Sequence, residues 1–442
     1  MAHATISNPY RRLIARINRF PQGAPPSRLL HAILKMLYTE QEAGYVSLLP
    51  LKPFALEKAA RIWKLPLRKT RQILDELASK GLLLDIEIRQ RPLYLVPPPM
   101  AGFFEFSMMR VRRDLDQKKL AELLYQYLNV EQDFVRELFT AGETRLGRIF
   151  VHEPALPEEK LLVLDYERAS HIIRTAGHIS VSLCYCRHKM RHLRRACDNP
   201  LEICMTFHQA GAYLIRRGIG RRVDAAEGLD LLQEAQGRNL VQFGENVREQ
   251  VNYICNCCSC CCEALLAAKR FSFARPVQTS PFLPRLNPET CIGCGKCTAA
   301  CPVEALKMTA GNPAAREKPA PRLDTQRCLG CGICVRNCPT GAMVLERRRE
   351  RLLTPLNSAH NVILMAIERG KLQHFLFDNR ILWHHRAMAL VLGVILRLPP
   401  IKQVLALQQV KSRYLEYLIS RTFMTEKNNR AHPPLDIPAH ID

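Results

Sequence analysis

The sequence lacks any apolar run long enough to cross a lipid bilayer as a helix. Its longest apolar stretch, Ala387 to Leu396, is far shorter than the roughly 20 residues that a spanning helix needs. The N-terminal segment also lacks the continuous apolar stretch and the small-residue cleavage site of a secretory signal. We therefore expect no transmembrane segment and no export, and predict a cytoplasmic protein.

A nucleotide-cofactor motif is also missing. The segment GIG at Gly218 to Gly220 lacks the third glycine of a dinucleotide-binding loop. We therefore predict no flavin or nicotinamide site and no self-contained substrate turnover. Any redox function would then depend on an external redox partner protein.

Acidic residues are absent from Met1 to Thr39, and the whole chain carries a formal net charge of +23. Apolar residues in this basic arm recur at helical spacing: Tyr10, Leu13, Ile14, Ile17 and Phe20. They predict a short amphipathic helix, which either packs on its own protein or makes peripheral contact with a membrane surface or a partner. The charge alone suits nucleic acid, anionic lipid or an acidic protein equally well.

The chain has eighteen cysteines, gathered in a few groups. This distribution is typical of metal ligands rather than of structural disulfides. Near neighbours in one segment rarely supply the separation and orientation that disulfide bridges need. The pattern therefore indicates metal or redox chemistry in a reducing compartment.

The strongest motif is a repeat, CIGCGKCTAACP followed by CLGCGICVRNCP, within residues 276–348. Each copy has the spacing C-x2-C-x2-C-x3-C-P and resembles the cluster-binding run of bacterial two-cluster ferredoxins. That resemblance implies two [4Fe-4S] clusters with crossed ligation, in which the fourth cysteine of each run serves the other cluster. The implied ligands are Cys291, Cys294, Cys297 and Cys338 for one cluster, and Cys328, Cys331, Cys334 and Cys301 for the second.

Ten further cysteines lie in residues 111–275, for which we predict a mostly helical domain: Cys184, Cys186, Cys197, Cys204, Cys255, Cys257, Cys258, Cys260, Cys261 and Cys262. Soft sulfur ligands select iron–sulfur clusters, zinc or copper(I). We predict that some of these thiols form a third site, with three alternatives open: a further iron–sulfur cluster, structural zinc, or a metal-free thiol cluster. Nearby basic residues favour thiolate: Arg187, Lys189, Arg191, Arg194 and Arg195.

The order of helices and strands predicted for residues 28–96 is three helices followed by a hairpin. It resembles a winged helix-turn-helix, with Leu67 to Lys80 in the recognition-helix position. Together with CYCR and CNCCSCCC, this segment and the repeat resemble a family of bacterial and archaeal 4Fe-4S binding proteins over roughly residues 28–345. The resemblance brings no assigned chemistry for the Cys-rich motif.

We therefore predict a multidomain α+β chain. Its parts are a basic arm and linker (1–27), a winged-helix-like domain (28–110), the Cys-rich helical domain (111–275), a ferredoxin-like βαβ two-cluster module (276–348) and a basic helical C-terminal region (349–442). The predicted function is iron–sulfur electron transfer. The alternative is a DNA-binding regulator that senses its clusters, and nucleic acid is the less favoured partner.

Overall fold

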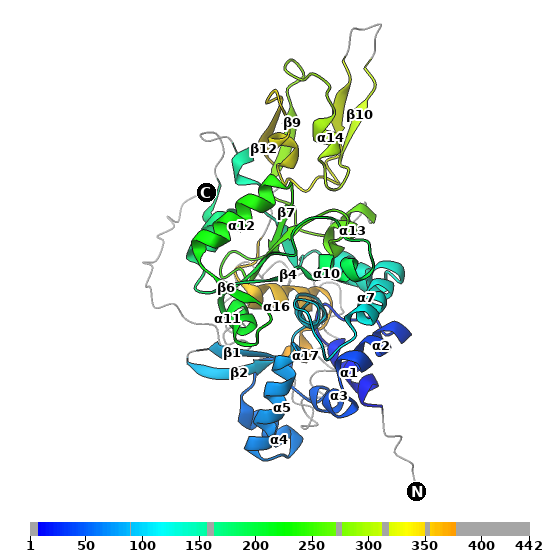
Figure 1. The fold of residues 1–442 in the computed structure, drawn as a ribbon, viewed down its shortest axis with the longest axis vertical. Coiled ribbons are helices and arrows are strands. Elements are labelled where there is room, and N and C mark those ends of the chain that lie inside the picture. The colour runs from blue at the N-terminus through cyan, green and yellow to red at the C-terminus, as the bar shows by residue number, and fades with distance from the viewer. Residues whose placement is uncertain are drawn as a thin grey trace, which may run out of the picture.

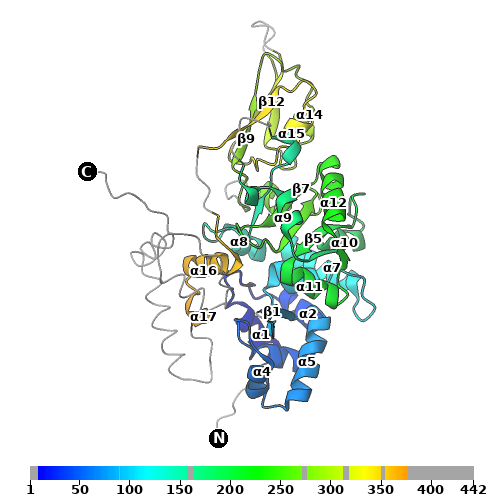
Figure 2. The same cartoon turned by 90° about the vertical axis from the view of Figure 1, so that its left-hand side faces the viewer.

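The computed structural model describes residues 8–88, 90–156, 163–270, 276–311, 318–349 and 354–376. The molecule is elongated, with the repeat module (276–348) at one end of the long axis and helices α4 and α5 at the other (Figures 1 and 2). A central body with the largest sheet lies between them. Helix and strand are both present, as expected for an α+β chain.

The basic arm forms helix α1 (Pro9–Ile17), which Asn8 caps by accepting the backbone N–H of Tyr10. Its apolar stripe is buried: Leu13 and Ile17 are each only 1% exposed. Helix α1 packs against α3 (Glu40–Val46). The stripe that predicted an amphipathic helix is thus covered by the protein itself.

The next segment contains helices α2 (Arg28–Leu37), α4 (Leu56–Trp63) and α5 (Leu67–Ser79), followed by the hairpin of β1 (Leu84–Ile88) and β2 (Arg91–Leu95). Helix α3 is an additional element that we did not predict. It begins with a capping box between Thr39 and Glu42, in which each side chain binds the other's backbone N–H. Phe54 also pairs with Tyr94 of β2.

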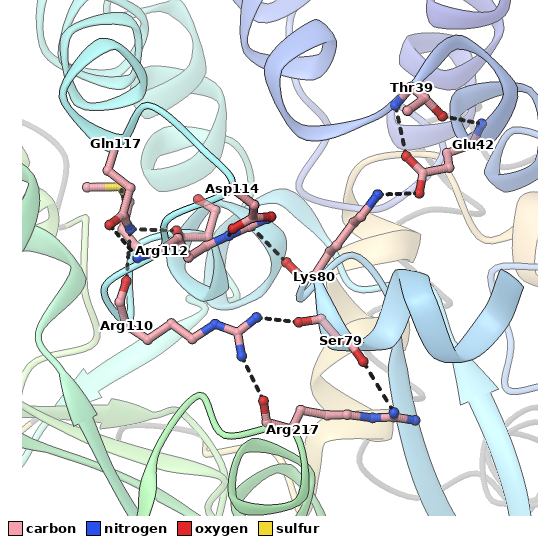
Figure 3. Close-up of polar contacts among 11 residues, drawn as sticks. Thr39, Glu42, Ser79, Lys80, Arg110, Arg112, Asp114, Gln117 and Arg217 are labelled. Carbon is pink, nitrogen blue, oxygen red and sulfur yellow. Dashed lines mark hydrogen bonds and ion pairs between the residues drawn. The ribbon is translucent and has the colours of Figure 1, made fainter. Parts of the chain in front are cut away.

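The C-terminal end of α5 is tied to the central body (Figure 3). Arg110 donates to the carbonyl oxygens of Ser79 and Arg217, and Arg112 donates to the carbonyl of Lys80. Lys80 in turn pairs with Glu42 at 2.6 Å. The N-terminal segment and the body are therefore joined by hydrogen bonds as well as by apolar contacts.

Several short helical segments follow the hairpin along the chain. They are η1 (Pro99–Phe103), α6 (Phe104–Phe106), α7 (Gln117–Tyr125), η2 (Gln126–Val130), α8 (Asp133–Thr140), η3 (Glu153–Ala155) and η4 (Asp165–Glu167). Helix α7 packs against both α2 and α10 (Tyr185–His192).

The central body is built on a six-stranded sheet in the order β3-β7-β8-β5-β4-β6, with every neighbouring pair antiparallel. The strands are β3 (Gly147–Ile149), β4 (Ile179–Leu183), β5 (Glu202–Phe207), β6 (Arg221–Val223), β7 (Val241–Glu245) and β8 (Tyr253–Cys257). The prediction of a mostly helical domain missed this sheet. Its strands are short, and two of them contain three of the cysteines that we interpreted only as ligands.

The two faces of the sheet have different partners. Helices α9 (Ala169–Thr175) and α12 (Ala225–Gly237) share an apolar core with alternate strand residues such as Val181, Met205 and Ile254. Because side chains alternate along a strand, Cys204, Cys255 and Cys257 point to the opposite face. Helices α11 (His208–Arg216) and α13 (Glu263–Arg270) complete the body.

The repeat module has two matching halves. Each half is a strand, a loop with a one-turn helix, and a second strand: β9 (Phe282–Leu286), α14 (Lys296–Ala299) and β10 (Leu306–Thr309), then β11 (Ala320–Leu323), α15 (Ile333–Arg336) and β12 (Met343–Arg347). Strand β9 pairs with β12 and β10 pairs with β11.

After the module the chain returns to the body through α16 (Ser358–Glu368) and α17 (Gln373–Leu376). The Glu368 carboxylate accepts backbone N–H groups of Glu143 and Thr144. The helices predicted beyond α17 lie outside the described residues. Within the described ranges, no helix is both long and apolar enough to span a bilayer.

Candidate metal centres

The eight cysteines of the repeat module line two separate hollows. The outer hollow is lined by Cys291, Cys294, Cys297 and Cys338. The inner hollow is lined by Cys301, Cys328, Cys331 and Cys334. Each hollow thus receives three cysteines from one run and the fourth cysteine from the other, which is the grouping that crossed ligation requires.

Glycines allow each run to wind around its hollow. Gly293, Gly295, Gly330 and Gly332 all have positive φ values, between 68° and 81°. A side chain disfavours this left-handed region. At Gly293 a Cβ atom would also lie 2.6 Å from the carbonyl oxygen of Pro319. The glycines in the motif therefore allow the backbone conformation of each run and do not merely separate its cysteines.

The two hollows differ in exposure. In the inner hollow Cys328, Cys331 and Cys334 are buried, whereas Cys294 of the outer hollow is exposed. Burial raises the pKa of Cys331 to about 12 and also raises that of Cys334. Without a metal these buried thiols would keep their protons, so a bound metal must displace the protons.

The inner hollow lies against the central body. The backbone N–H of His152 donates to the carbonyl of Cys331 at 2.9 Å. Lys269, at the end of α13, pairs with Glu304 at 2.9 Å, three residues after Cys301.

Six of the remaining ten thiols form a closed ring of contacts, which we call the six-thiol ring. Its members are Cys184, Cys186, Cys262, Cys257, Cys255 and Cys204, in order around the ring. Each thiol interacts with the one before it and with the one after it. The ring joins segments that are about seventy residues apart in the sequence.

Secondary structure positions every member of the ring. Cys204 and Cys255 come from the paired strands β5 and β8, and Cys257 is two residues further along β8. Cys184 is the N-cap of α10, and Cys262 precedes α13. Interactions with neighbouring thiols lower the pKa values of Cys184 and Cys262, and a backbone N–H in the first turn of each helix acts in the same direction.

The other four thiols form a compact group, which we call the tetrad: Cys197, Cys258, Cys260 and Cys261. Their sulfur atoms all lie within 4.8 Å of one another. The Cys197 and Cys258 sulfurs are 3.5 Å apart, and those of Cys260 and Cys261 are 3.6 Å apart. Hydrogen bonding from Cys261 and the charge of Arg187 lower the pKa of Cys258 to about 5. The structure therefore divides the ten predicted thiols into two groups, whereas we predicted a single third site.

Arg187 lies between the ring and the tetrad. Its side chain is fully buried, and it donates to the carbonyl oxygens of Pro200, at 2.8 Å, and Asn256. No carboxylate pairs with it among the described residues. The charges that face it are those of thiols in both groups, Cys184, Cys204 and Cys258. Of the other predicted basic residues, Arg191, Arg194 and Arg195 are exposed.

A buried ion pair holds the two helices that present ring thiols. Lys189 on α10 pairs with Glu263 on α13, and both side chains are at most 2% exposed. Asn129 bonds to both partners, at 2.8 Å and 2.7 Å. Sequence reasoning missed Asn129 and Glu263, because nothing in their local sequence marks them as partners of Lys189. It also missed His152.

The histidines near the CYCR segment are not part of either thiol group. His188 donates from Nδ1 to the carbonyl of Met108 at 2.7 Å, and its other ring nitrogen faces His192 at 3.2 Å. His178 lies beside Arg222. Their contacts are structural, as is usual for histidines near a site.

A family model described as a 4Fe-4S dicluster domain matches residues 290–342. The match spans both cysteine runs and both hollows. Residues 290–342 are an iron–sulfur cluster binding domain. No curated protein and no solved structure matches the chain. The rest of the molecule must therefore be interpreted from its own geometry, and below we call the repeat module the dicluster domain.

Proposed function

We propose that the protein is an electron-transfer protein, with one [4Fe-4S] cluster in each hollow of the dicluster domain. The observation that carries this proposal is the division of eight cysteines into two sets of four, each set drawing on both runs. Clusters of this kind exchange single electrons at low potential. The chain would accept electrons from, or deliver them to, a separate redox partner protein.

The hollows suit a cluster better than a single metal ion. In a cubane each thiolate binds a different iron, so the cluster holds its four thiolates apart. Among the described residues, only the tetrad has its sulfurs all within 4.8 Å of one another. The thiols of the two hollows are more widely spaced, as a cluster between them requires.

The unequal exposure of the hollows supports a route for electrons through the molecule. The outer hollow, with Cys294 exposed and Ile292 58% exposed, is the accessible place for a partner to exchange electrons. The inner hollow lies against the body, where His152 links Cys331 to Leu240. The next residue, Val241, pairs with Cys257 of the six-thiol ring.

The six-thiol ring is the third redox site of this proposal and would hold an additional iron–sulfur cluster. It offers more thiols than one cubane needs, and they are arranged in a ring instead of meeting at one point. The buried charge of Arg187 stabilises anionic sulfur beside it. Electrons would pass between the outer hollow, the inner hollow and the ring.

Metal analysis of the full chain, purified anaerobically, tests the proposal. We expect about eight iron atoms from the two cubanes, together with the additional iron of the ring, and clusters that can be reversibly reduced. Paramagnetic resonance of the reduced protein should show interacting clusters. Four or fewer irons, or iron that does not change oxidation state, would contradict the assignment.

One observation favours a second function, a regulator that binds DNA. Arg68, Lys69 and Arg71 are exposed on α5, whose far end accepts hydrogen bonds from Arg110 and Arg217 (Figure 3). A regulator of this kind would bind duplex DNA with a steep salt dependence that differs between cluster-loaded and cluster-free protein. Equal, weak retention of both forms would leave electron transfer as the function.

A further inference from the structure

The tetrad differs from every other thiol group of the described structure in its compactness. Its four sulfurs converge on one point, and its two printed sulfur–sulfur distances are 3.5 Å and 3.6 Å. Zinc–sulfur bonds of about 2.3 Å in tetrahedral geometry place neighbouring sulfurs about 3.8 Å apart. The tetrad is therefore already close to the geometry of four thiolates around a single ion.

The same distances argue against a cubane at this site. Four thiolates on four different irons would need to stand farther apart than the tetrad allows. Three of its members are also crowded into one tight turn, residues 258–261, between β8 and α13. The fourth, Cys197, comes from the loop after α10.

The surroundings of the tetrad suit a closed anionic site. Four thiolates around a divalent ion leave a net negative charge, which nearby donors can offset. Asn199 donates to the Cys197 sulfur at 3.3 Å, and the buried positive charge of Arg187 acts on Cys258. With four protein ligands the ion keeps no open position, which is the arrangement of structural rather than catalytic zinc.

We propose that Cys197, Cys258, Cys260 and Cys261 bind one zinc ion, separate from the iron–sulfur clusters. The ion would join the loop after α10 to the turn between β8 and α13. That turn is flanked by Cys257 and Cys262 of the six-thiol ring, so the zinc would also hold two ring members in position. This inference does not depend on electron transfer, because zinc is not redox-active.

The test uses the full chain, produced with both iron and zinc supplied and purified anaerobically. We expect about one zinc per chain, with four sulfur neighbours at about 2.3 Å in zinc X-ray absorption. A wild-type protein without zinc, or zinc with nitrogen or oxygen neighbours, would overturn the proposal. This measurement needs no variant, so it stands even if a substitution prevents folding.

Two exposed cysteines provide a matched pair of variants. Cys260→Ser should reduce the zinc content, or leave zinc with three sulfur neighbours and one oxygen, while the iron of the dicluster domain is retained. Cys294→Ser in the outer hollow should reduce iron and leave zinc unchanged. Zinc that responds to Cys294→Ser and not to Cys260→Ser would refute the assignment. Because the readouts are different metals, failure of the zinc site and failure of the electron-transfer proposal can be distinguished.

Discussion

The backbone N–H of His152 donates to the carbonyl oxygen of Cys331 across 2.9 Å, while its side chain faces the central sheet. Its Nε2 donates to the carbonyl of Leu240, also at 2.9 Å. This fully buried residue therefore contacts the inner hollow through its backbone and the sheet through its ring. Burial lowers the pKa of His152 to about 4, so the ring is neutral at physiological pH.

His152→Leu keeps the backbone contact with Cys331 and removes the ring contact with Leu240. We expect a loss of about 0.5–1.5 kcal/mol in the free energy of unfolding, because the hydrogen bond from the ring is lost while Gln242 still donates to the Leu240 carbonyl. The iron content should not change. Chemical denaturation with iron analysis measures both, and His171→Leu, at a partly exposed position on α9, is the control.

Crossed ligation predicts which variants lose the same cluster. Cys338→Ser and Cys291→Ser should both remove the cluster of the outer hollow, although these cysteines belong to different runs. Cys301→Ser and Cys328→Ser should both remove that of the inner hollow. Paramagnetic resonance spectra of the reduced variants show which cluster each variant has lost. If Cys338→Ser instead matched Cys328→Ser, each run would serve its own cluster.

Alanine substitutions at two glycines can distinguish the cost of a left-handed backbone from the cost of a steric clash. Gly293 and Gly341 have φ values of 68° and 66°, but only Gly293 has a backbone atom close to the place of a Cβ. Both alanine variants should lose roughly 1–2 kcal/mol from the left-handed conformation. Gly293→Ala should also lose the cluster of the outer hollow. Equal iron contents in the two variants would contradict this expectation.

The buried Lys189–Glu263 pair should contribute strongly to stability. Glu263→Gln leaves the Lys189 charge buried without compensation, which we expect to cost about 3–5 kcal/mol of unfolding free energy. The control is Glu234→Gln, which breaks an exposed pair with Arg238 and should cost about 0–1 kcal/mol. Urea denaturation compares the two. Similar losses would show that burial gives the pair no special role.

His374 on α17 predicts a pH dependence of stability. Burial lowers its pKa to about 4, and the charges of Lys371 and Arg16 act in the same direction. The pKa of histidine in an unfolded chain is about 6.5, so the unfolded state takes up the proton first as the pH falls. Stability is therefore complete above about pH 6.5 and decreases toward pH 4. His374→Gln should weaken this dependence in denaturation measured at several pH values, and an unchanged slope would argue against it.

The dicluster domain could be predicted closely because the residues that define it are close together in the sequence. Cysteine spacing, the glycines between them and the prolines after them all lie within two short runs. The division of the other ten thiols could not be predicted in this way. Cys204 meets Cys255 only because β5 pairs with β8, and this register depends on packing between distant segments.

The central sheet was missed for a related reason. The alternation in EICMTF and YICNC is typical of strands with one buried face, but their cysteines were interpreted as ligands alone. The buried partners of Lys189 were also inaccessible to sequence reasoning, because Asn129 and Glu263 are distant from it along the chain. Helices with strong apolar periodicity, such as α2 and α5, were easier to predict.

The pairing of Phe282 with Arg347 places the first and last strands of the dicluster domain side by side. The chain thus leaves the central body and returns to it at neighbouring points, and α16 then packs on that body through Glu368. A domain with adjacent ends can be inserted into a host fold without separating the host's own elements. The dicluster domain is therefore exchangeable in principle: another domain with neighbouring terminal strands could replace it while the thiol-bearing body keeps its fold.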